Sequence, residues 1–209
     1  MLRALTVFAV LLALLVHPAA AGTLNILAFG DSLTAGFGLE PGEAFPVKLE
    51  AALRARGHDV RVINAGVSGD TATAALDRLA WAVDDTIGAV IVELGANDAL
   101  RGQSPAETRK ALDAMLSALD QRKLPVLLAG MRAPPNLGAD YVRAFEAIYP
   151  ELAAAHGALL YPFFLDGVAA NPKLNQADGM HPNPAGVDRV VAAMLPHAEA
   201  LIARAAASP

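Results

Sequence analysis

The sequence predicts an α/β fold built on a parallel sheet with helices on both faces. Five apolar runs of strand character recur along the chain, and each is followed by a turn and a stretch of helical periodicity. This alternation is typical of parallel sheets, because neighbouring parallel strands need crossover connections. We expect the five strands over residues 24–29, 60–64, 89–94, 126–129 and 159–164.

Residues 1–21, which precede the first expected strand, have the composition of a cleavable signal peptide. Arg3 comes before an apolar run over residues 4–16, and Pro18 and three alanines follow it. The run is shorter than the roughly 20 residues that span a bilayer, so we expect cleavage after Ala21 and export to the bacterial periplasm or the medium. An anchoring or buried N-terminal helix is the alternative. Residues 22–209 then predict one monomeric domain.

The first and last long helices are marked by apolar periodicity. Phe45, Leu49 and Leu53 fall on one side of the first, and Gly57 is suited to end it in a left-handed conformation. Apolar side chains recur at helical intervals over residues 187–202, which predicts the last helix. Both helices should dock on the sheet through these apolar sides.

Two helices between them are marked by serine and proline. Ser104 is a suitable N-cap, Pro105 then occupies the first helical position, and Glu107 lies three residues past the cap. These signals predict a helix after the third strand. A later helix is expected over residues 140–155, and Pro150 should bend or split it.

Composition excludes several kinds of function. The chain has no cysteine, which rules out disulfides, a thiol nucleophile and thiolate metal sites. Its formal net charge of −5 gives no reason to expect nucleic acid as a partner. No metal-ligand spacing, phosphate loop or dinucleotide fingerprint is present, so we predict no metal and no cofactor.

Chemically suggestive residues follow the expected strands at the points where they end. Residues 30–32 follow the first strand, residues 66–70 the second and residues 95–98 the third, and residues 178–181 come between the fifth strand and the last helix. Ligands of open parallel sheets bind outside the carboxyl ends of the strands. We therefore expect these four segments to meet at one edge of the sheet.

The four segments contain the parts of a serine hydrolase. A serine hydroxyl needs a positioned imidazole to become a nucleophile, and the imidazole needs a carboxylate to orient it. Ser32, His181 and Asp178 can supply all three. Ser68 is a rival nucleophile because residues 66–69 resemble half of a Gly-x-Ser-x-Gly elbow, although Asp70 leaves that elbow incomplete.

Donors for a developing oxyanion are also available. The Gly69 amide can approach a negative charge closely, and the side-chain amide of Asn97 would face the serine from the neighbouring strand end. Each residue also has a purely structural interpretation. Glycine turns commonly lead into helix caps, and asparagine is common in turns.

Taken together, the motifs resemble those of the SGNH (GDSL) hydrolase superfamily. They are Gly-Asp-Ser-Leu at 30–33, Ser-Gly-Asp-Thr at 68–71, Gly-Ala-Asn-Asp at 95–98 and Asp-Gly-Met-His-Pro at 178–182. The chain is most similar to the branch of multifunctional thioesterases, lysophospholipases and arylesterases. One departure is Ala96, where close relatives often have a second glycine, so we expect a narrower or stiffer loop before Asn97.

The resemblance implies a flavodoxin-like α/β/α sandwich with a five-stranded parallel sheet. It implies Ser32 as nucleophile, His181 as base and Asp178 as orienting acid, with the backbone amides of Ser32 and Gly69 and the side chain of Asn97 as oxyanion donors. The implied reaction is hydrolysis of a small-molecule carboxylic ester or thioester, such as an aryl ester, a lysophospholipid or an acyl-CoA.

Substrate contacts are expected from two loops at the same edge. We assign substrate binding to Leu100, Arg101 and Gly102 in the loop after Asn97, and to Pro134 in residues 131–136. Two other functions remain open. A carbohydrate O-acetyl esterase would use the same triad, and a non-catalytic binding module would keep the fold alone.

Overall fold

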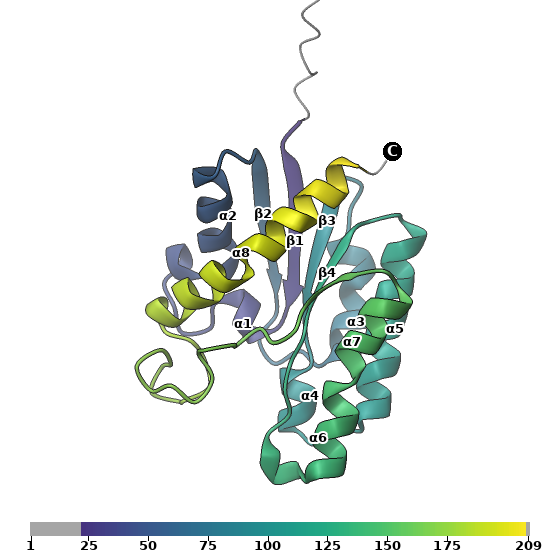
Figure 1. Ribbon diagram of the computed structural model, residues 1–209, viewed down its shortest axis with the longest axis vertical. Coiled ribbons are helices and arrows are strands. Elements are labelled where there is room, and N and C mark those ends of the chain that lie inside the picture. Colours follow the sequence, from purple (N-terminus) through teal and green to yellow (C-terminus); the bar gives the residue numbers. More distant parts are fainter. Residues whose placement is uncertain (1–21, 208–209) are drawn as a thin grey trace, which may run out of the picture.

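The computed structural model describes residues 22–207 and has a five-stranded parallel sheet between two layers of helices (Figure 1). The strands lie in the order β2-β1-β3-β4-β5, which confirms the predicted fold class. The bounds are β1 Leu24–Gly30, β2 Val60–Gly66, β3 Ile87–Glu93, β4 Val126–Ala129 and β5 Leu159–Tyr161. The predicted signal peptide lies outside the described residues.

Most strands agree with the predicted runs, but the fifth is shorter than expected. Strand β5 ends at Tyr161 rather than at residue 164. The next residue is Pro162, which has no N–H with which to continue the ladder. The chain nevertheless stays against β4 for a few residues, because Gly130 donates to the Tyr161 carbonyl at 2.7 Å and Phe164 donates to the Gly130 carbonyl at 2.8 Å.

Two long helices cover one face of the sheet. Helix α2 (Phe45–Ala55) packs against α8 (Pro184–Ala206). In Figure 1, α8 crosses in front of the strands and α2 lies beside β2. Phe45, Leu49 and Leu53 of α2 are buried, as their spacing predicts. Gly57 has φ +87° just past the helix end, the left-handed conformation expected of it.

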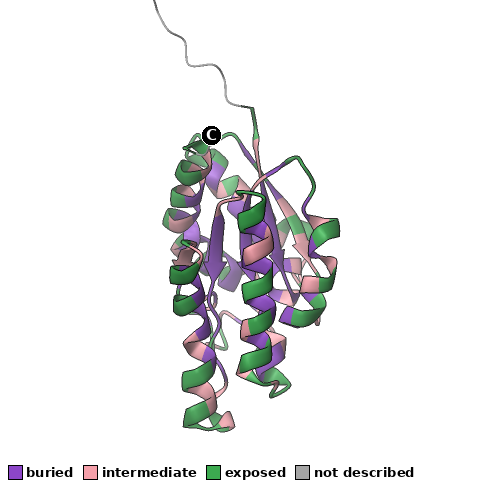
Figure 2. Cartoon of the chain, turned by 90° about the vertical axis from the view of Figure 1, so that its right-hand side faces the viewer, coloured by how far each residue is buried: buried purple, intermediate pink, exposed green. Residues whose placement is uncertain are grey.

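The other face carries α3 (Ala72–Ala82), α5 (Pro105–Gln121) and α7 (Ile148–Ala155), of which α5 contacts the other two. Ser104 caps α5 by accepting a hydrogen bond from Ala106 N at 3.3 Å. Figure 2 shows that the sheet and the inward sides of the helices form the buried core. Among the described residues, none of the helices is both long and apolar enough to cross a membrane.

The helix expected over residues 140–155 is split into two. Helix α6 (Ala139–Glu146) ends before Ala147, and α7 begins at Ile148. Pro150 explains the break, because its ring excludes the carbonyl of the residue four positions earlier and it has no N–H to offer that carbonyl. That earlier residue is Glu146, the last residue of α6.

The strand order places a crevice between the ends of β1 and β3. The chain leaves β1 toward β2 on one side, whereas β3 lies on the other side of β1. Loops therefore diverge at this point, which is where open α/β sheets bind ligands. Two short helices start in these loops, α1 (Ser32–Ala35) after β1 and α4 (Ala96–Leu100) after β3.

Candidate active site

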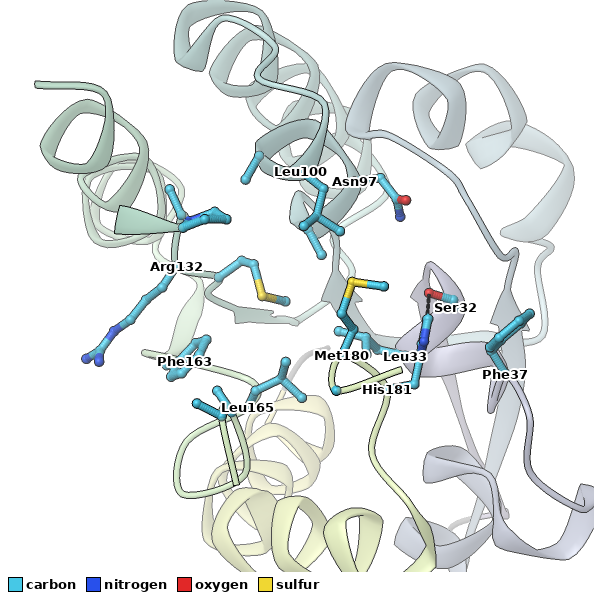
Figure 3. Close-up of a pocket in the computed structure, with 18 of the residues that line it drawn as sticks. Ser32, Leu33, Phe37, Asn97, Leu100, Arg132, Phe163, Leu165, Met180 and His181 are labelled. Atoms are coloured by element: carbon cyan, nitrogen blue, oxygen red, sulfur yellow. Dashed lines mark hydrogen bonds between the residues drawn. The ribbon is translucent and has the colours of Figure 1, made fainter. Parts of the chain in front are cut away.

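Ser32, His181 and Asp178 form a continuous hydrogen-bonded chain at this crevice. The distance from His181 Nε2 to Ser32 Oγ is 2.9 Å, although the two residues are 149 positions apart in the sequence. On its other side, His181 Nδ1 lies 2.7 Å from Asp178 Oδ2. Figure 3 shows the first contact as a dashed line at one side of a cavity. Nucleophile, base and orienting carboxylate are thus within reach of one another.

Asp178 also builds the loop that presents the histidine. Its Oδ1 accepts hydrogen bonds from the backbone N–H of Met180 at 2.9 Å and of His181 at 3.0 Å. These bonds, with that from the imidazole, lower the pKa of Asp178 to about 2. The carboxylate is therefore charged at neutral pH and favours the tautomer whose proton is on Nδ1. That tautomer leaves Nε2 free to accept the Ser32 proton.

The local sequence forces Ser32 to the start of a helix. A Cβ at Gly30 would overlap Thr34 Oγ1, so only glycine fits the tight turn that leaves β1. Asp31 then caps α1, with Oδ1 accepting from Leu33 N at 3.0 Å. The first amides of a helix have no intrahelical acceptor, so those near Ser32 are available to an anion.

Asn97 is tied to this turn by the same aspartate. Its Nδ2 donates to Asp31 Oδ2 at 3.0 Å, which holds the amide at the end of β3 facing the serine loop. Asp98, its neighbour, is buried and accepts bonds from Ala72 N at 2.9 Å and Thr108 Oγ1 at 3.0 Å, which braces the loop.

Two buried carboxyl groups lie beneath the site. Burial raises the pKa of Asp31 to about 6, and burial together with the charge of Asp31 raises that of Glu93 well above its ordinary value. Glu93 Oε2 accepts from Thr34 Oγ1 at 2.7 Å, whereas Oε1 has no partner among the described residues. We expect Glu93 to be protonated at neutral pH, because two adjacent buried charges are costly.

In the Gly-Ala-Asn-Asp motif over residues 95–98, the position that requires glycine is Gly95 and not Ala96. Gly95 has φ +111°, and a Cβ there would overlap Tyr149 Oη. Among the described residues, the only left-handed non-glycine residues are Lys123 and Ala170. Ala96 therefore lies outside the left-handed region, so alanine at this position needs no unusual backbone conformation.

The triad opens onto a cavity of about 730 Å³ whose lining is mainly apolar. Ser68, Gly69 and Asn97 line it together with Ser32 and His181. Phe163, Leu165 and Arg132 lie at the side away from Ser32 (Figure 3). Its other apolar lining includes Leu33, Phe37, Leu100, Met131, Ala133, Pro134 and Met180. This size is typical of small-molecule sites.

The predicted substrate residues divide between two environments. Leu100 and Pro134 line the cavity, whereas Arg101 and Gly102 do not. The Arg101 side chain instead contacts the loop after β2, where its Nη2 donates to the Gly69 carbonyl at 2.9 Å.

Several lining residues were missed by sequence reasoning. The rings of Phe37 and His181 are tilted by 39° with their centroids 4.7 Å apart. Phe163 lies just after β5, and its ring centre is 4.8 Å from the guanidinium carbon of Arg132, which belongs to the expected loop over residues 131–136. Met180 is half exposed at the cavity. Phe37 and Met180 lie in or next to the motifs, and Phe163 follows β5, so their positions in the sequence could have indicated that they line the cavity.

Two histidines outside the site contact carboxylate groups. His58 lies 3.3 Å from Glu199, and His156 lies between Asp113 and Asp120 at 2.7 and 2.6 Å. Within residues 22–207, no group of three histidine or carboxylate side chains is placed to hold a metal ion.

Comparisons with known proteins agree with this geometry. The profile of the GDSL-like lipase/acylhydrolase family matches residues 28–189. The esterase TesA of Pseudomonas aeruginosa is 39% identical over 192 residues, covering 91% of this chain and 94% of that protein. Thioesterase 1/protease 1/lysophospholipase L1 of Escherichia coli K12 is 40% identical over 177 residues, covering 84% and 83%.

Solved structures of esterases match as well. The SGNH-hydrolase family esterase AlinE4 is 51% identical with a TM-score of 0.73, covering 87% of this chain and 98% of that chain. The crystal structure of TesA is 38% identical with a TM-score of 0.80, covering 85% and 99%. Since the family profile spans most of the sequence and these esterases align along nearly their whole lengths, the chain belongs to the GDSL, or SGNH, family of hydrolases and is one of its esterases.

Proposed function

We propose that Ser32 is the nucleophile of a two-step acyl transfer, with His181 as general base and Asp178 as the carboxylate that orients it. The observation that carries the proposal is the unbroken contact from Asp178 Oδ2 through the imidazole to Ser32 Oγ, at 2.7 and 2.9 Å. Distances of this kind allow direct proton transfer.

The proposed chemistry follows from these contacts. Ser32 Oγ attacks the ester carbon while His181 Nε2 takes the hydroxyl proton, and the carbonyl electron pair moves to oxygen. Collapse of this intermediate breaks the bond to the alcohol or thiol, which leaves with the proton from Nε2. Water then attacks the acyl-enzyme and gives a proton to Nε2. When this second intermediate collapses, the bond to Ser32 Oγ breaks, the acid is released and Nε2 returns the proton to Oγ.

Negative charge develops on the carbonyl oxygen in both steps, and the site offers donors for it. We assign this role to the backbone amides of Ser32 and Gly69 and to Asn97 Nδ2. Asn97 has two N–H bonds on Nδ2, so one can hold Asp31 while the other points to the oxyanion.

The cavity favours a single acyl chain as the group transferred. Its mainly apolar lining suits an aliphatic or aryl chain better than a polyhydroxylated sugar, which favours carboxylic esters and thioesters over acetylated carbohydrates. Relatives named arylesterase and thioesterase/lysophospholipase support aryl esters, acyl thioesters and lysophospholipids as substrates. The signal-like residues 1–21 support action outside the cytoplasm.

Labelling with a fluorophosphonate tests the nucleophile. We expect Ser32→Ala to lose both labelling and esterase activity, while Ser68→Ala, which changes the other serine of the cavity, keeps labelling. Labelling that persists in Ser32→Ala would assign the nucleophile elsewhere. Rates with p-nitrophenyl esters of increasing chain length, a lysolipid and an acyl-CoA then rank the substrate classes.

A further inference from the structure

Arg78, a residue outside the cavity, binds the backbone behind the active site. It lies on α3, and its side chain reaches the carboxyl ends of β1 and β2. Nη2 donates to the Gly30 carbonyl at 2.9 Å, Nη1 to the Ala65 carbonyl at 2.9 Å, and Nε to Asp70 Oδ2 at 2.6 Å. The guanidinium carbon also lies 4.2 Å from the centre of the Phe29 ring.

Two partners of Arg78 are carbonyls at the ends of β1 and β2, and the third, Asp70, lies in the loop after β2. Gly30 lies two positions before Ser32, and Asp70 directly follows Gly69. One guanidinium group therefore joins the end of β1, from which the serine loop starts, to the loop that contains Gly69. The two loops also meet through Val67 N, which donates to the Gly30 carbonyl at 3.0 Å, but that bond reaches only the start of the second loop.

The chemistry of the contact requires arginine. The guanidinium is a planar fork that can bind several acceptors at fixed angles, whereas a lysine ammonium on a flexible stem cannot hold the same three in one plane. The pair is also largely shielded from solvent, with side-chain exposures of 24% for Arg78 and 14% for Asp70. Shielding strengthens such charge-assisted bonds relative to pairs exposed to water.

We propose that Arg78, with Asp70, is a positioning residue that fixes the distance between the Ser32 and Gly69 amides. The inference rests on the proposed function, in which both amides stabilise the oxyanion. Oxyanion donors act because they are already placed before charge develops. Loss of the Arg78 contacts should therefore weaken binding of the tetrahedral intermediate more than binding of the ester substrate.

Arg122 supplies a matched control at the opposite edge of the sheet. It binds the backbone carbonyls of Val83 and Asp84 and the Asp85 carboxylate in the loop that leads into β3. It is thus also an arginine that joins two carbonyls and an aspartate. Its partners precede β3, whereas the active site follows it.

The experiment compares Arg78→Lys and Asp70→Asn with Arg122→Lys on a soluble p-nitrophenyl ester. We expect Arg78→Lys to lower kcat about 10- to 100-fold, the effect of a misplacement on the order of 1 Å, while KM changes less than about threefold. Asp70→Asn should also lower kcat, but by a smaller factor than Arg78→Lys. The Arg122→Lys control should keep kcat within about twofold of the wild type, whatever it does to thermal stability.

A second measurement separates positioning from stability. An alkyl boronic acid adds to the serine as a tetrahedral anion, so its affinity reports the oxyanion site, whereas the carboxylic acid product reports only the acyl cavity. We expect Arg78→Lys to weaken the boronic acid by the same factor as kcat and to leave product affinity unchanged. Wild-type kcat and boronic acid affinity in a folded Arg78→Lys variant would overturn the proposal, and so would equal losses in Arg122→Lys. The proposed function is tested separately, by the fluorophosphonate labelling of Ser32. The kcat and boronic acid measurements on Arg78→Lys can therefore fail while that labelling succeeds.

Discussion

Asp178→Asn is the most informative single change at the site, because the structure predicts which contacts it keeps. The asparagine Oδ1 can still accept from Met180 N and His181 N, which bond to Asp178 Oδ1 at 2.9 and 3.0 Å. Its Nδ2 replaces the oxygen that lies 2.7 Å from His181 Nδ1. An N–H group there can only donate, so the imidazole proton must move to Nε2.

In that tautomer, His181 points a proton at Ser32 Oγ and cannot accept the one it must remove. The loss expected from the wrong tautomer is about 10⁴-fold in kcat, or about 5 kcal/mol of transition-state stabilisation. KM should change little, because Asp178 does not line the acyl cavity. The loop keeps both of its backbone bonds but loses the carboxylate charge that the lowered pKa shows to be stabilising, so we expect Asp178→Asn to lower the unfolding temperature less than Asp178→Ala.

The assay is steady-state hydrolysis of p-nitrophenyl butyrate together with thermal unfolding. Asp178→Ala removes all three bonds, and it should therefore lower kcat and also destabilise the chain by about 1–2 kcal/mol. Asp113→Asn is the matched control, since Asp113 lies 2.7 Å from His156 Nε2 away from the site. It should leave kcat unchanged. A folded Asp178→Asn variant with kcat within tenfold of the wild type would refute the reasoning.

Three further predictions address the oxyanion site, the buried acids and the third motif. Asn97→Ala should lower kcat about 10²- to 10³-fold with little change in KM, and a near-normal kcat on a simple ester would exclude Asn97 as a donor. The pKa of Asp31 is about 6 in the folded chain against an ordinary 3.8, so the folded state holds this proton more tightly, and the stability it contributes is complete below pH 3.8 and lost as pH rises through 6. Relative to the wild type, Asp31→Asn should gain about 2–3 kcal/mol of unfolding free energy in urea between pH 4 and pH 7, and a pH-independent difference would contradict this assignment. Gly95→Ala should lower the unfolding free energy by at least about 2 kcal/mol because of its φ of +111° and its overlap with Tyr149, whereas Gly42→Ala, which meets open space, should change it little.

Much of the fold follows from local patterns in the sequence. The apolar runs mark all five strands, and the alternation with helices requires them to be parallel. The main errors are at boundaries. The fifth strand ends early because Pro162 cannot donate to the ladder, and the helix near Pro150 breaks four residues before the proline, at the carbonyl that the ring excludes.

Part of the active site also follows from the order of the strands in the sequence. Parallel strands bring their carboxyl ends to one edge, so residues that follow different strands are expected to meet there, and Ser32, Asn97 and His181 do lie around one cavity. Arg101 shows where this stops. It follows Leu100 directly, yet Leu100 lines the cavity and Arg101 bonds to Gly69. Leu100 is the last residue of α4 and Arg101 follows it, so their side chains point in different directions, and the sequence alone does not give the rotation of that helix.

The sequence by itself therefore determined which strands form, at which edge the polar residues gather and which functional groups are available, because these depend on local periodicity and residue chemistry. Only the tertiary structure decided the shape of the acyl cavity, the tie between Asp31 and Asn97 and the reach of Arg78 behind both loops. These features are contacts between segments far apart in the chain, and their geometry is set by how helices pack and how side chains rotate once the sheet has formed.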